Sequence, residues 1–104
     1  MADLRHTVTH GDKNTLLAFE GEIDIANSRA MRTILLKAVA DTKQRLELNL
    51  QAVSSMDSSA IATLIEAHAK AEDSGKSFRV TAASERVLMA LKLLCLDTLL
   101  MGET

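Results

Sequence analysis

The residues best suited to chemistry in this sequence form one hydroxyl-rich run that contains a single carboxylate. The run is Ser54-Ser55-Met56-Asp57-Ser58-Ser59, and an amphipathic stretch with helical spacing begins directly after it. Asp57 or Ser58 therefore suits the N-cap of a helix, where a side-chain oxygen accepts a hydrogen bond from a free N–H group and contributes about 1 kcal/mol. The same free N–H groups, together with the helix dipole, also favour a phosphoryl group on an exposed serine. The run thus predicts either a plain helix cap or a phosphorylation site.

Ser58 and Ser59 are the two candidates for such a modification. Successive residues of a helix are rotated by about 100°, so the two hydroxyl groups point in different directions. If the helix begins at residues 57–58, Ser58 faces solvent at the cap, and Ser59 points aside toward the helix flank or the preceding loop. We therefore expect only the hydroxyl group of Ser58 to be accessible to a kinase.

Residues for other kinds of active site are missing from the sequence. Glycines occur only at positions 11, 21, 75 and 102, so there is no glycine-rich phosphate-binding loop. His6, His10 and His68 lack the paired spacing of a zinc or iron site. Ser58 lacks the flanking glycines of a hydrolase nucleophile. We expect no catalytic residue, no metal site and no cofactor, and therefore a protein that is not an enzyme.

Composition and charge exclude further functions. The chain has 104 residues, a net charge of -2, no tryptophan or tyrosine and only two phenylalanines, so it lacks the basic and aromatic surface that nucleic acids need. No apolar run approaches the roughly 20 residues that span a bilayer, and no signal-peptide pattern follows Met1, so we expect no membrane insertion. Cys95 is the single cysteine and lies among leucines, which predicts a buried, unreactive thiol, no intramolecular disulfide and a cytoplasmic protein.

Hydrophobic periodicity indicates the elements that must position the serine run. Alternation predicts strands over residues 4–10, 15–19, 46–50 and 78–81, and apolar spacings of three and four predict helices over residues 30–41, 57–74 and 84–94. Turn-forming residues at 11–14 make the first two strands an antiparallel hairpin, and strand-helix-strand units make the later strands parallel neighbours. We therefore expect one α/β domain over residues 1–104, with a mixed sheet of about four to five strands and amphipathic helices largely on one face.

Three segments together resemble the STAS domain, which is named for sulphate transporters and anti-sigma factor antagonists. They are Gly21-Glu22-Ile23-Asp24 after a strand, Leu46-Glu47-Leu48-Asn49-Leu50 as the next strand, and Met56-Asp57-Ser58-Ser59-Ala60-Ile61 at the next helix start. The resemblance covers nearly the whole chain and is closest to free-standing bacterial anti-sigma factor antagonists, whose patterns at these places are Gly-Glu-Leu-Asp and Met-Asp-Ser-Ser-Gly-Leu. Ala60 and Ile61 depart from that pattern and make the first helical turn bulkier and less flexible.

The resemblance implies a regulatory switch at Ser58. In this family the first hydroxyl residue after the aspartate is phosphorylated, and here that residue is Ser58. The partner-binding residues that the resemblance implies are Asp24, Met56, Asp57, Ser59, Ala60 and Ile61. The implied partner is an anti-sigma factor that is also a serine kinase of the histidine-kinase-type ATPase fold. It is bound while Ser58 is bare and released after phosphorylation, and a serine phosphatase reverses the change.

The resemblance leaves two other functions open. The same domain occurs as a small subunit of lipid-transporting ABC complexes, where it binds the ATPase without a phosphorylation switch. It also occurs in large stress-sensing assemblies, whose STAS components usually carry an additional sensory domain. A kinase and a phosphatase encoded beside this gene would favour the switch, whereas a transport ATPase and a permease would favour the transport subunit.

Overall fold

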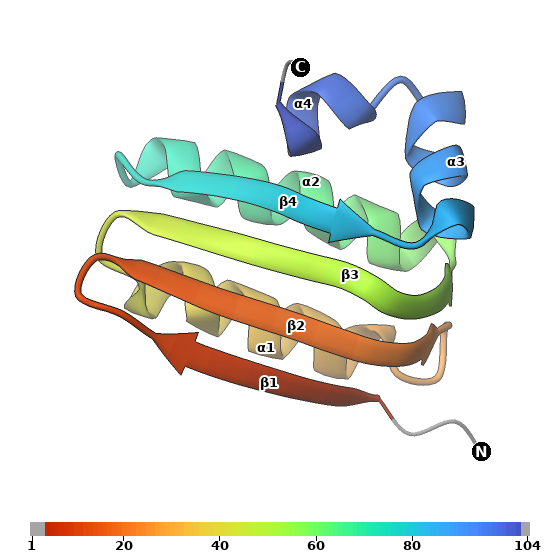
Figure 1. Ribbon diagram of the computed structural model, residues 1–104, viewed down its shortest axis with the longest axis horizontal. Coiled ribbons are helices and arrows are strands. Elements are labelled where there is room, and N and C mark those ends of the chain that lie inside the picture. Colours follow the sequence, from red (N-terminus) through yellow and green to blue (C-terminus); the bar gives the residue numbers. More distant parts are fainter. Residues whose placement is uncertain (1–3, 103–104) are drawn as a thin grey trace.

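A four-stranded mixed sheet forms the centre of the structure, a computed structural model that describes residues 4–102. The elements in chain order are β1 (Arg5–His10), β2 (Asn14–Ile23), α1 (Ser28–Asp41), β3 (Arg45–Met56), α2 (Ser58–Asp73), β4 (Ser77–Ala83), α3 (Glu85–Leu93) and α4 (Asp97–Met101). The strands lie in the order β1-β2-β3-β4, with β1 antiparallel to β2 and the other neighbours parallel (Figure 1). The predicted α/β class, the hairpin and the mixed sheet are confirmed.

Helices α1 and α2 cover one face of the sheet, and α3 and α4 gather beside β4 (Figure 1). The alternation of β3 decides which face is covered. Leu46, Leu48 and Leu50 are buried on the helix side, whereas Asn49 and Gln51 are exposed on the other side. The helices contribute Met31, Leu35, Leu64 and Ala67 to the same core. Burial of these apolar side chains is what holds the two layers together.

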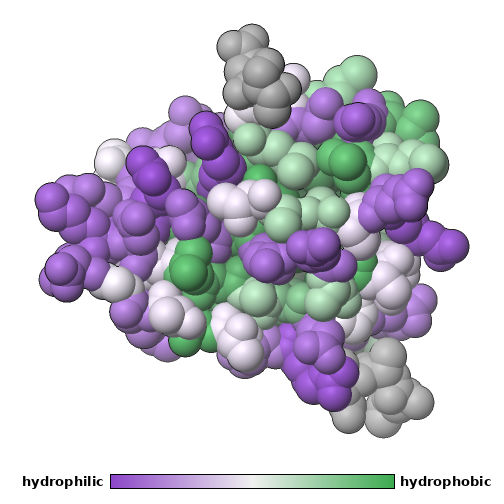
Figure 2. Space-filling model, in the orientation of Figure 1, coloured by the Kyte–Doolittle hydropathy of each residue, from purple (hydrophilic) through white to green (hydrophobic). Residues whose placement is uncertain are grey.

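Within residues 4–102 no helix lies on the opposite face of the sheet, and Figure 2 views the molecule from this side. Apolar residues lie near the middle of this view and toward its upper right, and hydrophilic residues predominate at the left and along the lower edge (Figure 2). Leu16 of β2 is 49% exposed on this face. The sheet therefore has one packed face and one face of mixed polarity in contact with water.

Strands β2 and β3 both run further than the alternation of the sequence predicts. Ser55 pairs with Glu22 and Met56 with Ile23, so the first half of the serine run is strand rather than turn. Gly21 adopts φ 114° where the pairing of β2 and β3 shifts register. Strand propensity depends strongly on context, and pairing with β2 here outweighs the low propensity of serine.

Two predicted helix starts and one predicted helix end are confirmed. The Asp57 side chain caps α2 by accepting a hydrogen bond from the N–H of Ala60, and Ser84 caps α3 by accepting one from the N–H of Val87. Gly75 follows the end of α2 with φ 70°, a left-handed conformation that glycine adopts without steric cost.

The end of the chain differs from the single final helix that the sequence predicts. Helix α3 ends at Leu93, and a turn with φ 58° at Cys95 leads into α4. The N–H of Leu96 donates to the C=O of Leu91 at 2.8 Å, which is the hydrogen bond of a Schellman cap. The turn leaves Leu93 78% exposed and Cys95 exposed, so the prediction of a buried thiol is wrong. No glycine marks this helix end, which is why the sequence pattern did not reveal it.

Candidate partner-binding and modification site

The carboxyl ends of β2 and β3 bring the two predicted motifs together at one edge of the sheet. Because the strands are parallel, the segments that follow them leave the sheet on the same side. Ile23 is paired with Met56, and the N–H of Asp57 donates to the C=O of Ile23 at 3.1 Å. The loop that begins at Asp24 therefore lies beside the start of α2. Loops at the carboxyl ends of parallel strands are common positions for binding sites.

At the start of α2, one carboxylate holds two donors. Asp57 Oδ1 accepts a hydrogen bond from the N–H of Ala60 at 2.9 Å and another from the hydroxyl of Ser59 at 2.8 Å. Ser58 is the first residue of the helix and is exposed, and its hydroxyl has no hydrogen-bond partner among residues 4–102. Ser59 is also exposed, whereas the sequence predicts that only the hydroxyl group of Ser58 is accessible. The hydrogen bond to Asp57, rather than burial, distinguishes Ser59 from Ser58.

The loop over residues 24–27 is closed by hydrogen bonds to itself. Asp24 Oδ1 accepts from the N–H of Ala26 at 2.9 Å, and Asn27 Oδ1 accepts from the N–H of Asp24 at 2.9 Å. Asn27 Nδ2 also donates to the C=O of Glu22 at 2.8 Å. The Asp24 carboxylate thus stabilises the loop conformation, and the Asn27 side chain links the loop to β2 by a hydrogen bond.

Ile25 at the tip of this loop is a residue that the sequence analysis did not identify. Its side chain is 85% exposed, although isoleucine is usually buried. It directly follows Asp24 and precedes α1, so it belongs to no helical or strand pattern. An apolar residue outside any periodic pattern, placed next to an acidic motif residue, is the signal that would have indicated it.

The remaining predicted site residues differ in how much surface they offer. Met56 is partly buried and packs against the core. Ala60 is 0% exposed and Ile61 is 7% exposed, because both face the sheet from the first turn of α2. Their packing fixes the helix start beneath Ser58. Their assignment to the partner-binding surface stays a prediction.

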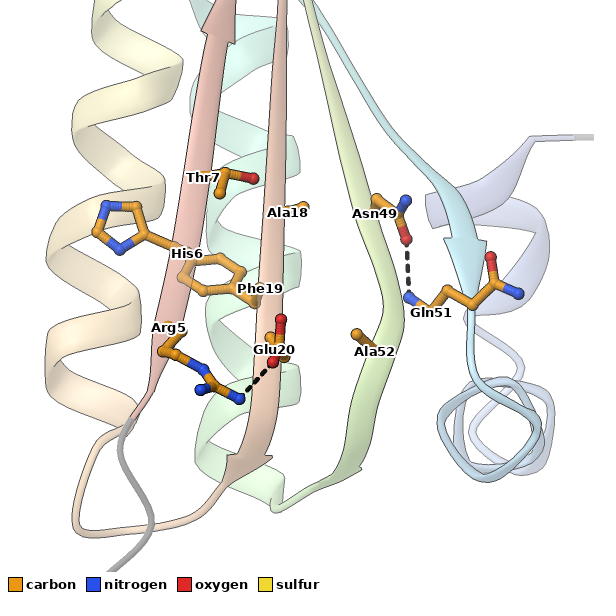
Figure 3. Close-up of a pocket in the computed structure, with 9 residues that line it drawn as sticks. All are labelled: Arg5, His6, Thr7, Ala18, Phe19, Glu20, Asn49, Gln51 and Ala52. Atoms are coloured by element: carbon orange, nitrogen blue, oxygen red, sulfur yellow. Dashed lines mark hydrogen bonds and ion pairs between the residues drawn. The ribbon is translucent and has the colours of Figure 1, made fainter.

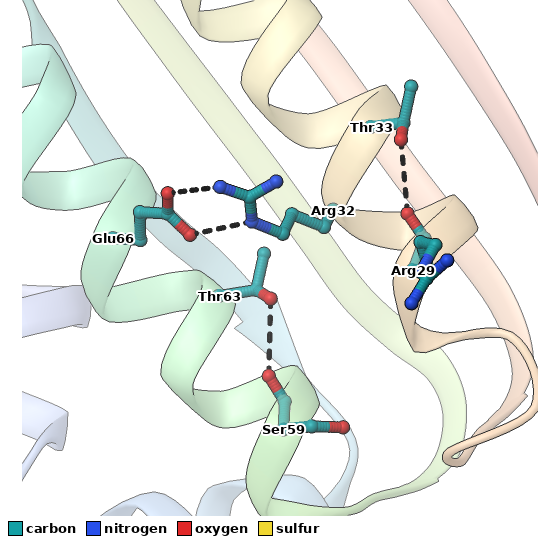
Figure 4. A network of polar contacts seen from close by, with 6 residues as sticks. All are labelled: Arg29, Arg32, Thr33, Ser59, Thr63 and Glu66. Atoms are coloured by element: carbon teal, nitrogen blue, oxygen red, sulfur yellow. Dashed lines mark hydrogen bonds and ion pairs between the residues drawn. The ribbon is translucent and has the colours of Figure 1, made fainter.

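Polar contacts join α1 to α2 (Figure 4). The Arg32 guanidinium donates to both carboxylate oxygens of Glu66, through Nε at 2.9 Å and Nη2 at 2.6 Å. This contact raises the pKa of Arg32 and lowers the pKa of the Glu66 carboxyl. Within α2, the Thr63 hydroxyl donates to the C=O of Ser59 at 3.1 Å. The Arg32–Glu66 contact thus connects α1 to α2 across the surface of the helical layer.

Acidic side chains predominate at this edge of the sheet. Glu22, Asp24 and Asp57 all belong to the two adjacent segments, and the Ser55 hydroxyl donates to Glu22 Oε2 at 3.4 Å. Arg29 is an exposed cation on the first turn of α1. Among residues 4–102, no group of three or more histidine, cysteine or acidic residues has an arrangement that could hold a metal ion.

A hollow lies elsewhere, on the uncovered face of the sheet (Figure 3). It measures about 700 Å³ and is lined in part by Arg5, Glu20, Asn49 and Gln51. Arg5 forms an ion pair with Glu20, and Asn49 Oδ1 accepts a hydrogen bond from the backbone N–H of Gln51 at 2.8 Å. Ser58 does not line this hollow. No helix in the described part of the chain is long and apolar enough to cross a bilayer.

Comparison with known proteins identifies similar chains. A family model described as "Mlab, STAS domain" matches residues 6–102. The crystal structure of an anti-sigma factor antagonist from Mycobacterium paratuberculosis is similar with a TM-score of 0.83 and 22% identity, over 94% of this chain and 83% of that one. The anti-sigma factor antagonist SpoIIAA in its unphosphorylated form gives a TM-score of 0.78 and 17% identity, over 96% and 89% of the two chains. The phosphorylated form of SpoIIAA from Bacillus gives 0.68 and 16%, over 96% and 92%.

Proposed function

This chain belongs to the STAS domain family, and from that premise we propose that it is a phosphorylation-controlled binding protein, an anti-sigma factor antagonist. In this proposal an anti-sigma factor with serine-kinase activity binds while Ser58 is bare and dissociates when Ser58 carries a phosphoryl group. The observation that carries the proposal is the position of Ser58: it is exposed at the first residue of α2, beside the loop that bears Asp24 and Ile25. The chain acts as a substrate and ligand, not as an enzyme.

The unphosphorylated surface combines one apolar side chain with a preformed polar edge. Ile25 projects from the loop, and Ser58 and Asp57 lie on the adjacent helix start. Interfaces derive most of their binding energy from a few central side chains, and polar groups around them exclude water. Ile25 supplies such an anchor, with Ser58 within the area that a partner would cover.

Phosphorylation changes the charge of this surface without removing contacts inside the fold. A phosphoryl group adds about two negative charges at Ser58, next to the carboxylates of Asp57 and Asp24. A partner seated on the helix start would have to bury or repel this hydrated dianion, and the cost of several kcal/mol is enough to dissociate a micromolar complex. The free N–H groups and the dipole of α2 tolerate the added charge, so the fold survives.

The kinase and an opposing phosphatase complete the cycle. The kinase of the histidine-kinase-type ATPase fold supplies ATP and magnesium, and a serine phosphatase restores the bare hydroxyl. Because both are cytoplasmic enzymes in this scheme, the proposed site of action is the cytoplasm.

Phosphorylation assays with the purified chain test the proposal. The chain is incubated with ATP, magnesium and each anti-sigma-factor-type serine kinase of its own genome, and the product is mapped by mass spectrometry. We expect one phosphoryl group on Ser58, none on Ser58→Ala, and normal modification of the matched control Ser59→Ala. Ser58→Ala should stay bound to the kinase, and Ser58→Asp should bind weakly.

Two outcomes would count against the scheme. Tight kinase binding by Ser58→Asp would remove the argument from charge repulsion. Phosphate on Ser59, by contrast, would shift the site by one residue and preserve the mechanism. No phosphorylation by any of these kinases would overturn the switch, and the transport-subunit function would then be tested by binding to a transport ATPase.

A further inference from the structure

The two edge strands of the sheet differ in whether another element of the chain covers them. Helix α4 packs beside β4, the edge strand on one side. On the other side, in the part of the chain that the structure describes, β1 pairs only with β2, and all six of its residues are exposed (Figure 1). Edge strands are usually protected by lysine, proline, a bulge or a covering element, because their unpaired N–H and C=O groups attract another strand. β1 has no lysine, no proline and no register shift against β2.

The alternation of hydrogen-bonded pairs in the β1–β2 hairpin shows which backbone N–H and C=O groups of β1 do not bond to β2. Gly11 N–H donates to the C=O of Asn14 at 2.7 Å, so this pair is of the hydrogen-bonded type. Hydrogen-bonded and non-hydrogen-bonded pairs alternate along an antiparallel ladder. Arg5, Thr7 and Thr9 therefore direct their N–H and C=O groups toward β2. The corresponding groups of His6, Val8 and His10 point away from the sheet, toward the free edge.

The sequence of this edge is symmetric about Val8. It reads His6-Thr7-Val8-Thr9-His10 and is identical in both directions. If a second β1 lies antiparallel with a twofold axis at Val8, then Val8 faces Val8, Thr7 faces Thr9 and His6 faces His10. This register places outward-facing residues opposite outward-facing residues, so each such pair exchanges both of its backbone hydrogen bonds. Cross-strand pairs of threonine and of β-branched residues are themselves favourable.

We propose that β1 is a homodimerisation edge, at which a second copy of this chain adds its own β1 antiparallel about Val8. The two four-stranded sheets then form one continuous sheet. The twofold arrangement reverses the direction of the second copy, so the Ser58 surfaces lie at opposite ends of this sheet and remain open. The proposal goes beyond the phosphorylation switch and does not depend on it.

The surroundings of β1 fit a second copy. A groove of about 190 Å³ lies between β1 and α1 and is lined by Val8, Ile34, Lys37 and Asp41 among others. Lys37 and Asp41 form an ion pair at 2.8 Å, so these two rim residues add no net charge against an identical neighbour. A paired strand brings a second Val8 next to this groove. Pairing of one short strand buries less than the roughly 1,200 Å² of standard interfaces, so we expect a weak, concentration-dependent dimer.

Disulfide trapping tests the register directly. Val8→Cys is prepared in a Cys95→Ser background, with Thr7→Cys in the same background as the matched control, and both are treated with oxidised glutathione. Residues opposite each other in a hydrogen-bonded pair have Cα atoms about 5.5 Å apart, which suits a disulfide, so Val8→Cys should give a covalent dimer. Thr7 lies opposite Thr9, so two Thr7→Cys thiols are separated by more than about 7 Å and should cross-link at least about tenfold more slowly. Equal rates for the two variants would overturn the proposed register.

Sedimentation of variants without engineered cysteines provides a second test. The wild-type chain should show a monomer–dimer equilibrium, and Val8→Thr should keep it because threonine is also β-branched. Val8→Pro removes an N–H group that faces outward, so the fold is retained while dimerisation weakens at least about tenfold. Circular dichroism confirms the fold of each variant. A wild-type chain that stays monomeric up to millimolar concentration would overturn the proposal. This holds even if β1 then binds an extended segment of another protein.

Discussion

Asp57 contributes to both the stability of α2 and the difference between the two serines. Its Oδ1 atom accepts from the Ala60 N–H and from the Ser59 hydroxyl. The first contact satisfies a free N–H donor of the helix. The second engages the Ser59 hydroxyl, which would otherwise compete with the Ser58 hydroxyl for phosphorylation. One carboxylate therefore links the local fold to the choice of modification site.

Removal of this carboxylate should affect both properties. We expect Asp57→Ala to lower the free energy of unfolding by about 1 kcal/mol, because the cap is lost, and the melting temperature by about 4–8 °C. Asp57→Asn keeps a capping oxygen and serves as the control. Thermal denaturation measures the difference, and equal melting temperatures for Asp57→Ala and the wild type would show that the cap contributes nothing. In the kinase assay, Asp57→Ala should also permit some phosphorylation of Ser59.

Ile25 should matter for binding and not for folding. We expect Ile25→Ser to change the free energy of unfolding by less than about 0.5 kcal/mol, because the side chain makes little contact with the fold, and to weaken kinase binding at least about tenfold. Leu16→Ser, at an exposed leucine of the uncovered sheet face, is the matched control and should bind normally. Titration calorimetry separates the two variants, and equal affinities would exclude Ile25 as an anchor.

At the scale of elements, α1 and α2 are joined by the contact between Arg32 and Glu66. Arg32 lowers the folded-state pKa of the Glu66 carboxyl below its ordinary value of about 4.3. The stabilisation is therefore present above that ordinary value and is lost as the pH falls through the lowered pKa. The contact is exposed to solvent, so its effect on stability is small.

Glu66→Gln should reveal this contact through its pH dependence. We expect the variant to melt at most a few degrees, about 1–3 °C, below the wild type at neutral pH, and the gap to close as the pH falls below about 4. Thermal denaturation between pH 3 and pH 7 measures the gap. A gap that widens toward acidic pH would contradict the assignment of the lowered pKa to Glu66.

The turn between α3 and α4 places a residue with a side chain where glycine is usual. Cys95 has φ 58°, a conformation that costs a residue other than glycine roughly 1–2 kcal/mol. We expect Cys95→Gly to raise the melting temperature, by about 4–8 °C if about 1 kcal/mol is recovered. Cys95→Ala keeps the steric cost and is the control. An equal gain in both variants would show that the thiol, and not the backbone conformation, is responsible.

The same elements explain how much the sequence alone could predict. The alternation at Leu46, Leu48 and Leu50 and the caps at Asp57 and Ser84 were predictable because burial and capping depend on side chains a few residues apart. The extension of β3 through Ser55 was not, because it depends on pairing with β2. The exposure of Ile25 and of Cys95 was not predictable either, because both lie in turns, where hydrophobic periodicity carries no information.

For the whole molecule, the proposed switch requires that modification leaves the fold intact. Ser58 lies outside the core, and Ala60 and Ile61 beneath it anchor α2. We expect Ser58→Asp to keep cooperative unfolding and a melting temperature within a few degrees of the wild type, since the helix dipole favours the charge by about 0.3–1 kcal/mol and Asp57 opposes it. Calorimetry checks this, and loss of the cooperative transition would show that Ser58 supports the core.

The hydrogen bonds of Asp24 and Asn27 have a further consequence, for the speed of binding. A loop that is already held in one shape loses little chain entropy when a partner arrives, and encounter needs no folding step. Association should then proceed at the ordinary rates of rigid docking, about 10⁵–10⁷ M⁻¹s⁻¹, with or without mutations that alter affinity. Differences between partners would appear mainly in how long each complex lasts.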